Sequence, residues 1–487
     1  MLFVFVVGCG LAAAIVLFFV DRFQTHDAVR RNFPVIGRFR SLFSTLGEFF
    51  RQYFFAMDRE EMPFNRAQRE WVHRASHDSI GNMIAFGSTR NIDIPGTPIF
   101  VNSAFPPLDE EAAPAPPLVI GLGARVPYLA RSIFNISGMS YGAISKPAVQ
   151  ALSHGAKMAG CWMNTGEGGV SPYHLESGCD IVYQIGTAKY GVRDAEGRLD
   201  DGKLREIASH EQIRMFEIKL SQGAKPGKGG ILPGEKITPE IAKIRGIEMG
   251  KDSYSPNRHA EVHNWNELID FVEHVREVTG KPVGVKLCIG SPDGIRPFFD
   301  AIVSRGAACA PDFITIDGGE GGTGAAPMPL MDLMGISIKE ALPRMVDIRA
   351  EYGLQDRIRL IAGAKLIVPG EVGWALAAGA DFVVSARGFM FALGCIQALK
   401  CNKNTCPTGI TTHNPRFQKG LVVAEKKDRV ATYVKEIVHE VEIIAHSVGV
   451  AHPRALERCH VRLVMTNGRS KRMDVLFPEP EARSSAA

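Results

Sequence analysis

The sequence lacks a strong excess of charge of either sign and is poor in cysteine. Its 56 Lys and Arg residues against 52 Asp and Glu residues leave a net charge of +4 over 487 residues. A nucleic-acid-binding protein shows a basic stripe or an isoelectric point above about 9, so we expect no nucleic-acid partner. Nine cysteines are too few for a disulfide scaffold in a chain of this length. A hydrophobic content of 45% excludes disorder over the whole chain.

Charge is absent altogether from the first twenty residues. About 20 apolar residues in a helix span the hydrocarbon core of a membrane. A cleaved signal peptide is the alternative, but it needs a basic start and a small-residue cleavage site, and neither is present. Residues 21–51 hold six Arg against three acidic residues, and positive charge stays cytoplasmic. We therefore expect a single-pass anchor over 1–20 in the inner (cytoplasmic) membrane, with the catalytic body in the cytoplasm.

Residues 21–130 are expected to form a juxtamembrane region that also covers the following domain. Within it, residues 33–55 are rich in Phe and Arg, which suits either a helix in the membrane interface or a helix of the core. Residues 106–117 are rich in Pro, Ala and acidic residues, so we expect an exposed connection there.

From about residue 131 the chain repeats one pattern, in which a short apolar run ends in a Gly-, Ser- or Lys-bearing turn and a helical stretch follows. Such alternation favours parallel strands joined by helices. Eight units over about 260 residues predict the α/β class and a TIM (β/α)8 barrel over 131–394. The eight candidate strand ends are 133–142, 160–169, 180–188, 216–230, 283–290, 313–322, 360–366 and 382–388.

Polar and Gly-rich residues gather at these strand ends, where barrel enzymes carry their chemistry. The turns around Gly363 and over 385–388 offer backbone N–H groups and one cation to a phosphate. A literal G-x-G-x-x-G match at 319–324 also follows a strand, but two prolines come after it and no clean helix begins there. We therefore expect a Gly-rich loop over the barrel mouth rather than a dinucleotide site.

Three cysteines lie within twelve residues, in the spacing C-x5-C-x4-C-P formed by Cys395, Cys401 and Cys406. Grouped cytoplasmic cysteines indicate metal more than disulfide. Structural zinc usually has four ligands, whereas three thiolates suit a 3Fe–4S cluster, and a Pro after the last Cys recurs in iron–sulfur sequences. Zinc and buried thiols without a metal stay open as alternatives on spacing alone.

The order and length of six motifs make the chain resemble the stand-alone, membrane-anchored branch of the FMN-binding glutamate synthase family. The motifs are NISGMSYGAIS (135–145), NTGEGG (164–169), KLSQGAKPGKGGILPG (219–234), DGGEGGTGAAP (317–327), LGCIQALKCNKNTCPTGITTHNP (393–415) and HEVEIIAHSVGV (439–450). The resemblance implies a barrel carrying FMN with a 3Fe–4S cluster beside it. It also implies an oxidoreductase that reduces the imine of 2-oxoglutarate and ammonia to glutamate.

Carried over residue by residue, the resemblance implies four groups of site residues. The catalytic group is Glu167, Lys225 and Lys286. The flavin-binding group is Ser137, Met139, Ser140, Asn164, Gln184, Lys286, Gly318, Gly319, Gly363, Ala386 and Arg387. The substrate group is Lys219, Lys225 and Arg245. The cluster ligands are Cys395, Cys401 and Cys406.

Two departures from the family pattern concern the substrate. Ile231 stands where the family has a Gln that contacts the oxo-acid, and Lys228 replaces an acidic residue. An amidotransferase domain would need a catalytic N-terminal Cys, and Cys9 lies in the membrane segment instead. No nicotinamide domain is recognised either. We therefore expect ammonia or an amine to arrive from solution or a partner, and electrons from a donor such as ferredoxin or a reductase subunit.

Two further hypotheses stay open. One is an FMN-barrel oxidoreductase that acts on another oxo-acid and amine pair, which Ile231 favours. The other is a membrane-tethered flavin and iron–sulfur electron-transfer subunit, which the substrate-type Lys225 and Arg245 disfavour. Beyond the barrel we expect an iron–sulfur loop and C-terminal helices over 395–477, with helix over 421–450, and a disordered tail over 478–487.

Overall fold

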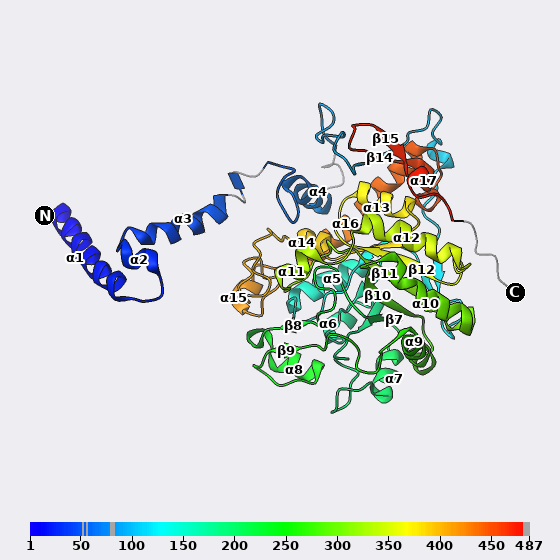
Figure 1. Cartoon of the computed structure of the whole chain (residues 1–487), viewed down its shortest axis with the longest axis horizontal. Helices are drawn as coiled ribbons and strands as arrows, with labels where there is room; N and C mark the ends of the chain where they lie inside the picture. Colours follow the sequence, from blue (N-terminus) through cyan, green and yellow to red (C-terminus); the bar gives the residue numbers. More distant parts are fainter. Residues whose placement is uncertain (51–52, 55–56, 78–82, 481–487) are drawn as a thin grey trace. The chain divides into compact units, whose positions relative to one another are not determined.

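The computed structural model describes residues 1–50, 53–54, 57–77 and 83–480, with no account of the side chains of residues 41, 48 and 49. The chain divides into two compact units, Met1–Glu70 and Trp71–Ala487, and the boundary falls inside helix α4 (Arg66–His77). Figure 1 labels the elements along the chain.

The first unit begins with helix α1 (Leu2–Phe23), which confirms a helix over the predicted anchor and extends it by three residues. The helix is long and apolar enough to cross a membrane, and none of its most apolar window is buried. Helices α2 (Ala28–Asn32) and α3 (Gly37–Phe50) follow. Of the predicted segment 33–55, residues 51–52 and 55 lie outside the described residues.

An ion pair joins the end of α1 to the start of α3. Asp21 is only 1% exposed. Arg38 donates to it from Nη2 at 2.7 Å and from Nε at 2.8 Å, and the backbone N–H of Val35 donates at 2.9 Å. The apolar side chains of α3 are exposed along one helical stripe, made by Phe39, Leu42, Phe43, Leu46 and Phe50.

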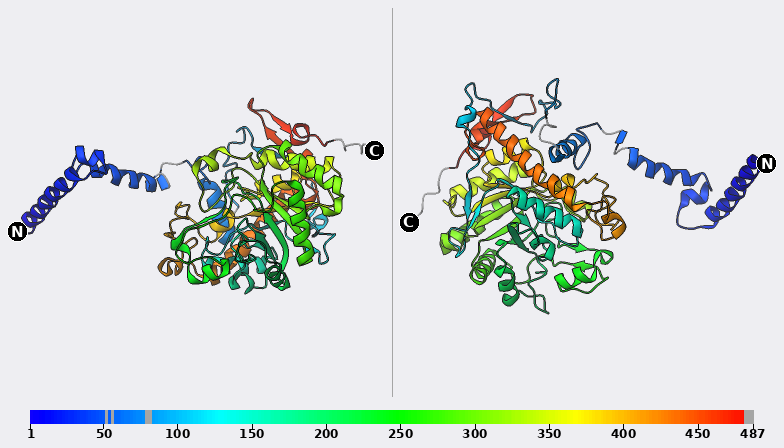
Figure 2. Two further views of the ribbon diagram at one scale, coloured as in Figure 1. Left: turned by 60° about the horizontal axis from the view of Figure 1, so that its bottom comes forward. Right: turned by 180° about the vertical axis from the view of Figure 1, so that it is seen from behind.

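The second unit is built around a closed barrel of eight parallel strands (Figures 1 and 2). Neighbouring strands follow the order β10-β11-β12-β13-β4-β5-β6-β7. All eight predicted strand regions are confirmed, and so is the TIM-type barrel. The strands are β4 (Phe134–Ile136), β5 (Met163–Asn164), β6 (Ile181–Ile185), β7 (Ile213–Lys219), β10 (Val283–Cys288), β11 (Phe313–Asp317), β12 (Arg359–Gly363) and β13 (Phe382–Ser385).

Each barrel strand is followed, before the next, by at least one helix. Helix α9 illustrates how the sequence sets the ends and the packing of these helices. The Asn264 side chain caps its first turn, Gly280 ends it in a left-handed conformation, and one face of Leu, Ile, Phe and Val is buried. The helices are α5 (Lys146–Ala159), α6 (Pro172–Leu175), α7 (Asp201–Ser209), α8 (Pro239–Arg245), α9 (Trp265–Thr279), α10 (Pro292–Arg305), α11 (Met328–Leu333), α12 (Ile338–Glu351), α13 (Pro369–Ala377) and α14 (Arg387–Ala392).

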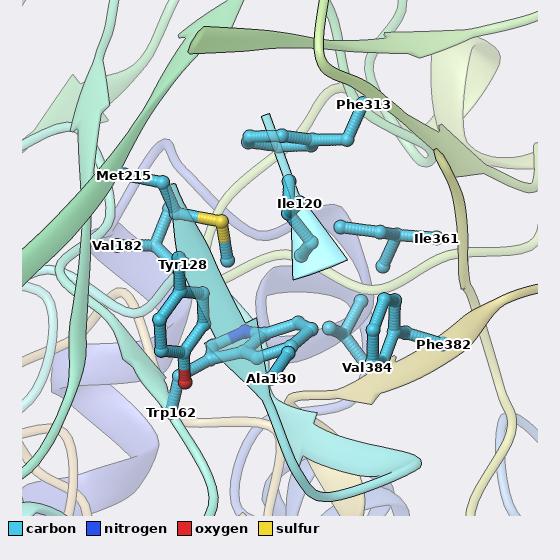
Figure 3. Packing of buried hydrophobic residues seen from close by; sticks show 10 residues of the cluster. All are labelled: Ile120, Tyr128, Ala130, Trp162, Val182, Met215, Phe313, Ile361, Phe382 and Val384. Atoms are coloured by element: carbon cyan, nitrogen blue, oxygen red, sulfur yellow. The ribbon is translucent and has the colours of Figure 1, made fainter. Parts of the chain in front are cut away.

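An antiparallel hairpin of β2 (Leu118–Ile120) and β3 (Tyr128–Ala130) packs against the barrel interior. Figure 3 shows Ile120, Tyr128 and Ala130 from this hairpin beside inward-facing strand residues. The aromatic ring of Trp162 lies edge-on to those of Tyr128 and Phe382, with centroids 6.3 and 5.1 Å apart. This cluster packs apolar side chains into one end of the barrel, and the polar side chains lie toward the other end, where the strands finish.

The C-terminal part adds a long helix and small sheets. Helix α16 (Val423–Val448) confirms the predicted helix and packs along α5. Strands β1 (Pro98–Phe100), β14 (Val461–Val464) and β15 (Ser470–Arg472) form a second sheet, and β8 (Ile231–Leu232) pairs with β9 (Ser253–Tyr254). Helices α15 (Pro415–Gln418) and α17 (Met473–Leu476) are short. Most of the predicted tail, residues 481–487, lies outside the described residues.

The contact between α5 and α16 generates a stability prediction. A Cβ atom at Gly155 would lie 2.5 Å from Val430 Cβ and 2.8 Å from the Lys427 carbonyl oxygen. Overpacking of this kind costs about 1–3 kcal/mol, more than the roughly 1 kcal/mol that Ala gains over Gly in a helix. Gly155→Ala should therefore lower the free energy of unfolding, measured by urea denaturation.

The matched control is Gly294→Ala in α10, where a new Cβ meets only Ser291 Cβ at 3.9 Å. That variant should be unchanged or more stable. Equal effects of the two substitutions would show that α5 and α16 do not pack as described.

Candidate active site

A cavity of about 160 Å³, open to solvent, lies at the C-terminal ends of the barrel strands. It gathers side chains from turns that are far apart in sequence. Of the predicted site residues it brings together Met139, Ser140, Glu167, Gln184, Lys219, Lys225, Arg245, Lys286, Ala386, Arg387 and Cys401, and Ile231 lines it too. The three loops 322–325, 230–233 and 401–402 form part of its wall.

The side chains at the base of this cavity are fixed by Glu217, which sequence reasoning missed. Its carboxylate is 3% exposed and lies inside the barrel. The amides of Asn164 and Gln184 donate to one oxygen at 2.8 and 2.6 Å, and the Thr315 hydroxyl donates to the other at 2.6 Å. The only signal in the sequence was an acidic residue within the apolar strand run FEIKL.

One wall carries an ion pair between Glu167 and Lys219, with Oε1 and Nζ 3.0 Å apart. Burial by itself disfavours the carboxylate of Glu167. The positive charges of Lys219 and Lys225 outweigh this and hold the pKa of Glu167 below its usual value. Glu167 is therefore ionised at neutral pH and is a poor proton donor.

Two lysines in the cavity have depressed pKa values. Burial, with a smaller contribution from Lys219, lowers the pKa of Lys225 to about 8. Burial also lowers the pKa of Lys236 to about 8. Lys236 was not predicted; it is 2% exposed, and its Nζ donates to the carbonyl oxygens of Ala143 at 2.7 Å and Cys401 at 3.2 Å. Either lysine can release a proton near neutral pH.

Arg245 ends α8 and is 4% exposed. Its Nη2 donates to the Ser140 hydroxyl at 3.2 Å and to the Tyr141 carbonyl at 3.0 Å, and its guanidinium carbon lies 5.2 Å from the centre of the Tyr190 ring. Its Nε is buried and has no hydrogen-bond partner among the described residues. A buried donor without a partner is costly, which favours an anion in this cavity.

Lys286 lies on β10, beside Lys219 of the neighbouring strand β7, and it is held in an ion pair. Its Nζ lies 3.2 Å from Asp317 Oδ2. Burial opposes the charge of Lys286, but Asp317 and Glu217 outweigh it and raise the pKa above its usual value. Lys286 is therefore a permanent cation at the end of β10.

The Gly-rich segment 319–324 reaches the cavity, as expected of a loop over the barrel mouth. Gly322, Thr323 and Gly324 line the cavity, and the Arg387 guanidinium donates from Nη2 to the Thr323 carbonyl. The next helix, α11, begins only at Met328 and has six residues. No helix of the kind that a dinucleotide site needs follows this motif directly.

Five predicted flavin-binding residues lie outside the cavity lining. Ser137 and Asn164 line a smaller cavity inside the barrel. Gly318, Gly319 and Gly363 line neither, and the N–H groups of the first two already donate to the carbonyls of Gly363 and Ile336, at 2.9 and 2.8 Å. The turn at Ala386 and Arg387 is thus the part of the predicted phosphate site that faces the cavity.

The cysteine segment has its three thiols in different settings. Cys395 Sγ accepts from the Gln397 N–H at 3.4 Å, Cys401 Sγ lies 3.9 Å from Arg387 Nη1, and the Cys406 thiol contacts the Thr408 hydroxyl at 3.3 Å. Across the described ranges no three His, Cys, Asp or Glu side chains converge on one metal position. The thiols therefore do not form a closed ligand set in this structure.

The family model described as a conserved region in glutamate synthase matches residues 119–451. The chain belongs to the glutamate synthase family. It is 39% identical to a glutamate synthase large subunit-like protein of Bacillus subtilis over 94% of this chain and 95% of that one. It is 34% identical to the archaeal glutamate synthase [NADPH] of Methanocaldococcus jannaschii over 70% of this chain and 64% of that one.

As a member of this family, the protein is a glutamate synthase-like oxidoreductase. The match to an archaeal-type glutamate synthase [NADPH] of Thermotoga maritima covers 64% of this chain and 59% of that one, at 33% identity. The chain thus spans less than two thirds of the length of these two [NADPH] relatives. The matched region contains all eight barrel strands and all three grouped cysteines.

The depressed pKa of Lys225 predicts how anion binding depends on pH. Because Lys225 is charged only below about pH 8, the affinity for glutarate, an unreactive dicarboxylate, should fall roughly tenfold between pH 7 and 9. Lys225→Arg keeps the charge and should flatten this fall, leaving the part due to Lys236. Calorimetry at several pH values measures both, and an equally steep fall in the variant would remove Lys225 from the anion site.

Proposed function

We propose that this protein reduces the imine formed from 2-oxoglutarate and ammonia to glutamate, with FMN and a 3Fe–4S cluster as cofactors. One observation carries the proposal: a single cavity at the barrel mouth is lined by five buried basic side chains, two of which are lysines with a pKa of about 8, and a cysteine of the C-x5-C-x4-C segment forms part of its wall. The homologues with glutamate synthase names support the reaction type.

The substrate is bound through its carboxylates. Arg245 and Lys225 are both buried cations of the cavity lining, and Arg binds a carboxylate through two parallel hydrogen bonds. The Arg245 Nε without a partner is one of the donors that a carboxylate would satisfy. Two anionic groups in this cavity would offset the cost of burying so many positive charges.

The proton is supplied by Lys225 rather than by Glu167. A general acid works best when its pKa lies near the working pH, and Lys225 meets this condition while the pKa of Glu167 is depressed. Glu167, held as a carboxylate 3.0 Å from Lys219, instead favours a cationic iminium over a neutral imine. Reduction then needs two electrons, and the carbon–nitrogen double bond becomes a single bond.

The residues present fit FMN. The Gln184 amide, the Met139–Ser140 turn and Lys286 line one part of the cavity, and the Ala386–Arg387 turn offers backbone N–H groups and a guanidinium for a phosphate. A Cβ at Gly138 would lie 3.0 Å from both Asn164 Oδ1 and Gln184 Nε2, so only glycine leaves space there. FMN supplies hydride-equivalent transfer, and Lys286 provides a positive charge that stabilises its reduced anionic form.

The cysteine segment also suits a 3Fe–4S cluster. Each thiol has a hydrogen-bond donor or a cation beside it, as cluster sulfurs commonly do. Three residues of this segment, Gln397, Leu399 and Asn404, have φ between +53° and +58°. Such strain persists only where the surroundings demand that conformation, which is typical of functional loops.

A second candidate function is the amination of another oxo-acid. Ile231 lines the cavity where the family has a Gln, so an apolar side chain faces the substrate region. Lys228, by contrast, does not line the cavity. A bulkier or more apolar oxo-acid would gain contact with Ile231, whereas 2-oxoglutarate loses a hydrogen bond. A pure electron-transfer role would not explain why two cations, Lys225 and Arg245, are buried in the cavity lining.

For the location, we propose a single-pass inner-membrane protein with a cytoplasmic body. Helix α1 supplies the span, and the exposed stripe of α3 suits the lipid–water interface. The Asp21–Arg38 ion pair would hold the two helices at a fixed angle where the chain leaves the bilayer. Ammonia or an amine, and the electrons, come from outside the chain.

Arg245→Ala tests the substrate pocket. Loss of a buried charged partner should cost roughly 2–4 kcal/mol of transition-state binding, about 30- to 1,000-fold in kcat/KM, with flavin and iron content unchanged. If Arg245→Ala leaves kcat/KM unchanged for every oxo-acid that the protein accepts, Arg245 does not bind the substrate.

Ile231→Gln tests the identity of the oxo-acid, because it adds a hydrogen-bond donor to the cavity and should raise the affinity for 2-oxoglutarate. If Ile231→Gln abolishes turnover and an apolar oxo-acid is preferred, glutamate is the wrong product.

The cysteine assignment predicts that Cys401→Ser loses iron and the broad visible absorption of a cluster. Cys459→Ser, outside the segment, is the matched control and should retain both. Iron analysis and absorption spectra of the purified proteins decide the matter. Full iron content in Cys401→Ser, or stoichiometric zinc in the unaltered protein, would contradict the assignment.

A further inference from the structure

Another cavity lies at the opposite end of the barrel from the candidate active site, at the N-terminal ends of four neighbouring strands, β5, β6, β7 and β10. We call it the bottom cavity. Its volume is about 440 Å³, against about 160 Å³ for the cavity at the barrel mouth, and the two share no lining residue. Ligand pockets typically enclose roughly 300–1,000 Å³, so the bottom cavity has room for a small molecule.

Positive charge dominates the lining of the bottom cavity. It is lined by one acidic residue, Asp180, and by four basic residues, Arg131, Lys157, Arg214 and Lys281. Asp180 is already engaged: Arg214 Nε donates to one carboxylate oxygen at 2.7 Å, and the Tyr128 hydroxyl donates to the other at 3.1 Å. The other three cations form no ion pair with any of the described residues.

These three cations still have hydrogen-bond donors to offer. Within the described ranges, the side chains of Arg131 and Lys157 make no hydrogen bond. Lys281 Nζ donates to the carbonyl oxygens of His210 and Ile213, and an ammonium group has a third N–H. Burial, with a smaller contribution from the charge of Arg214, lowers the pKa of Lys281 to about 8, so this lysine is charged at pH 7. The donors therefore suit an anionic ligand.

The rest of the lining is mostly apolar. Val126 and Leu129, from the segment that carries the β2–β3 hairpin, are 57% and 48% exposed, and the buried Ile213 begins the wall at β7. A bare inorganic anion would leave these side chains in contact with water. A ligand that contacts the whole lining must combine an acidic group with an apolar body.

The bottom cavity is independent of the candidate active site. Along β7, Arg214 lines the bottom cavity, Met215 belongs to the apolar cluster of Figure 3, and Lys219 lines the cavity at the mouth. A ligand in the bottom cavity therefore touches none of the residues proposed to hold the substrate or the flavin. Its binding does not rest on the proposed function.

We propose that the bottom cavity binds a small phosphate monoester with an apolar or aromatic body. A phosphate monoester carries a charge of about −1.5 to −2 near pH 7 and has three strong acceptor oxygens, which matches three unpaired cations more closely than a single carboxylate does. The apolar side chains contact the body of the ligand. Binding is non-covalent, so no bond is made or broken.

The test uses calorimetry near pH 7 on the full-length holoprotein in lipid nanodiscs. Phenyl phosphate is the probe. Inorganic phosphate lacks the apolar body, phenylacetate replaces the phosphate by a carboxylate, and benzyl alcohol removes the charge. The test variant is Arg131→Ala/Lys157→Ala. The matched control, Lys435→Ala/Arg469→Ala, removes one exposed Lys and one exposed Arg far from the lining of this cavity.

We expect phenyl phosphate to bind at one site, more tightly than the three other compounds. The test variant should weaken its binding roughly tenfold or more, and the control variant should have little effect. No saturable binding, equal losses in the two variants, or equal affinity for inorganic phosphate, phenylacetate or benzyl alcohol would overturn the proposal.

A further variant and a competitor locate the bound phosphate. Leu129→Trp keeps every charge but fills the bottom cavity, so it should also weaken the binding of phenyl phosphate. Saturating glutarate, directed at the cavity of the mouth, should have no effect on that binding. If glutarate displaces phenyl phosphate and neither Leu129→Trp nor Arg131→Ala/Lys157→Ala weakens it, the phosphate binds at the mouth and the proposal is wrong. Failure of the glutamate-forming reaction would leave these measurements unchanged.

Discussion

The carboxylate of Glu217, buried inside the barrel, is the constraint on which the candidate active site depends. It accepts hydrogen bonds from residues of β5, β6 and β11 while it belongs to β7, so four of the eight strands are tied at one point. A buried carboxylate is tolerated only with such partners. These hydrogen bonds also fix the positions of the Asn164 and Gln184 side chains. The backbone of Gly138 lies close against both amides, so this part of the cavity base is fixed with them.

Above this base, the site is dominated by positive charge that the protein itself does not neutralise. Glu167 and Asp317 each pair with one lysine, but Lys225, Lys236 and Arg245 are buried with few or no acidic partners. Burial lowers the pKa values of Lys225 and Lys236 to about 8. The positive charges of Lys219 and Lys225 hold the pKa of Glu167 below its usual value. A cavity of this kind suits anion binding, and for this reason the proposed reaction takes its proton from a lysine rather than from Glu167.

The sequence allowed the fold to be predicted well because each barrel strand is an apolar run closed by a glycine or polar turn, as in FITIDGG (313–319), and this pattern depends on local structure alone. The cavity residues from those turns could be named for the same reason. Glu217 and Lys236 could not. Whether a charged residue in an apolar strand faces the barrel interior depends on register, and Lys236 enters the cavity only because the loop from β8 folds back against Ala143. The sequence also could not show that the N–H groups of Gly318 and Gly319, predicted to bind phosphate, donate to backbone carbonyls of other segments instead.

The central claim is that the cavity aminates 2-oxoglutarate with ammonia. The most direct measurement is a single-turnover reaction of the reduced holoprotein, under anaerobic conditions, with 2-oxoglutarate and ¹⁵N-labelled ammonium, followed by mass spectrometry of the amino acid formed and by the absorption of the flavin. The account predicts one ¹⁵N-labelled glutamate for every two electrons lost from the protein. Reoxidation without labelled glutamate, or labelled product only when a different oxo-acid is supplied, would contradict it.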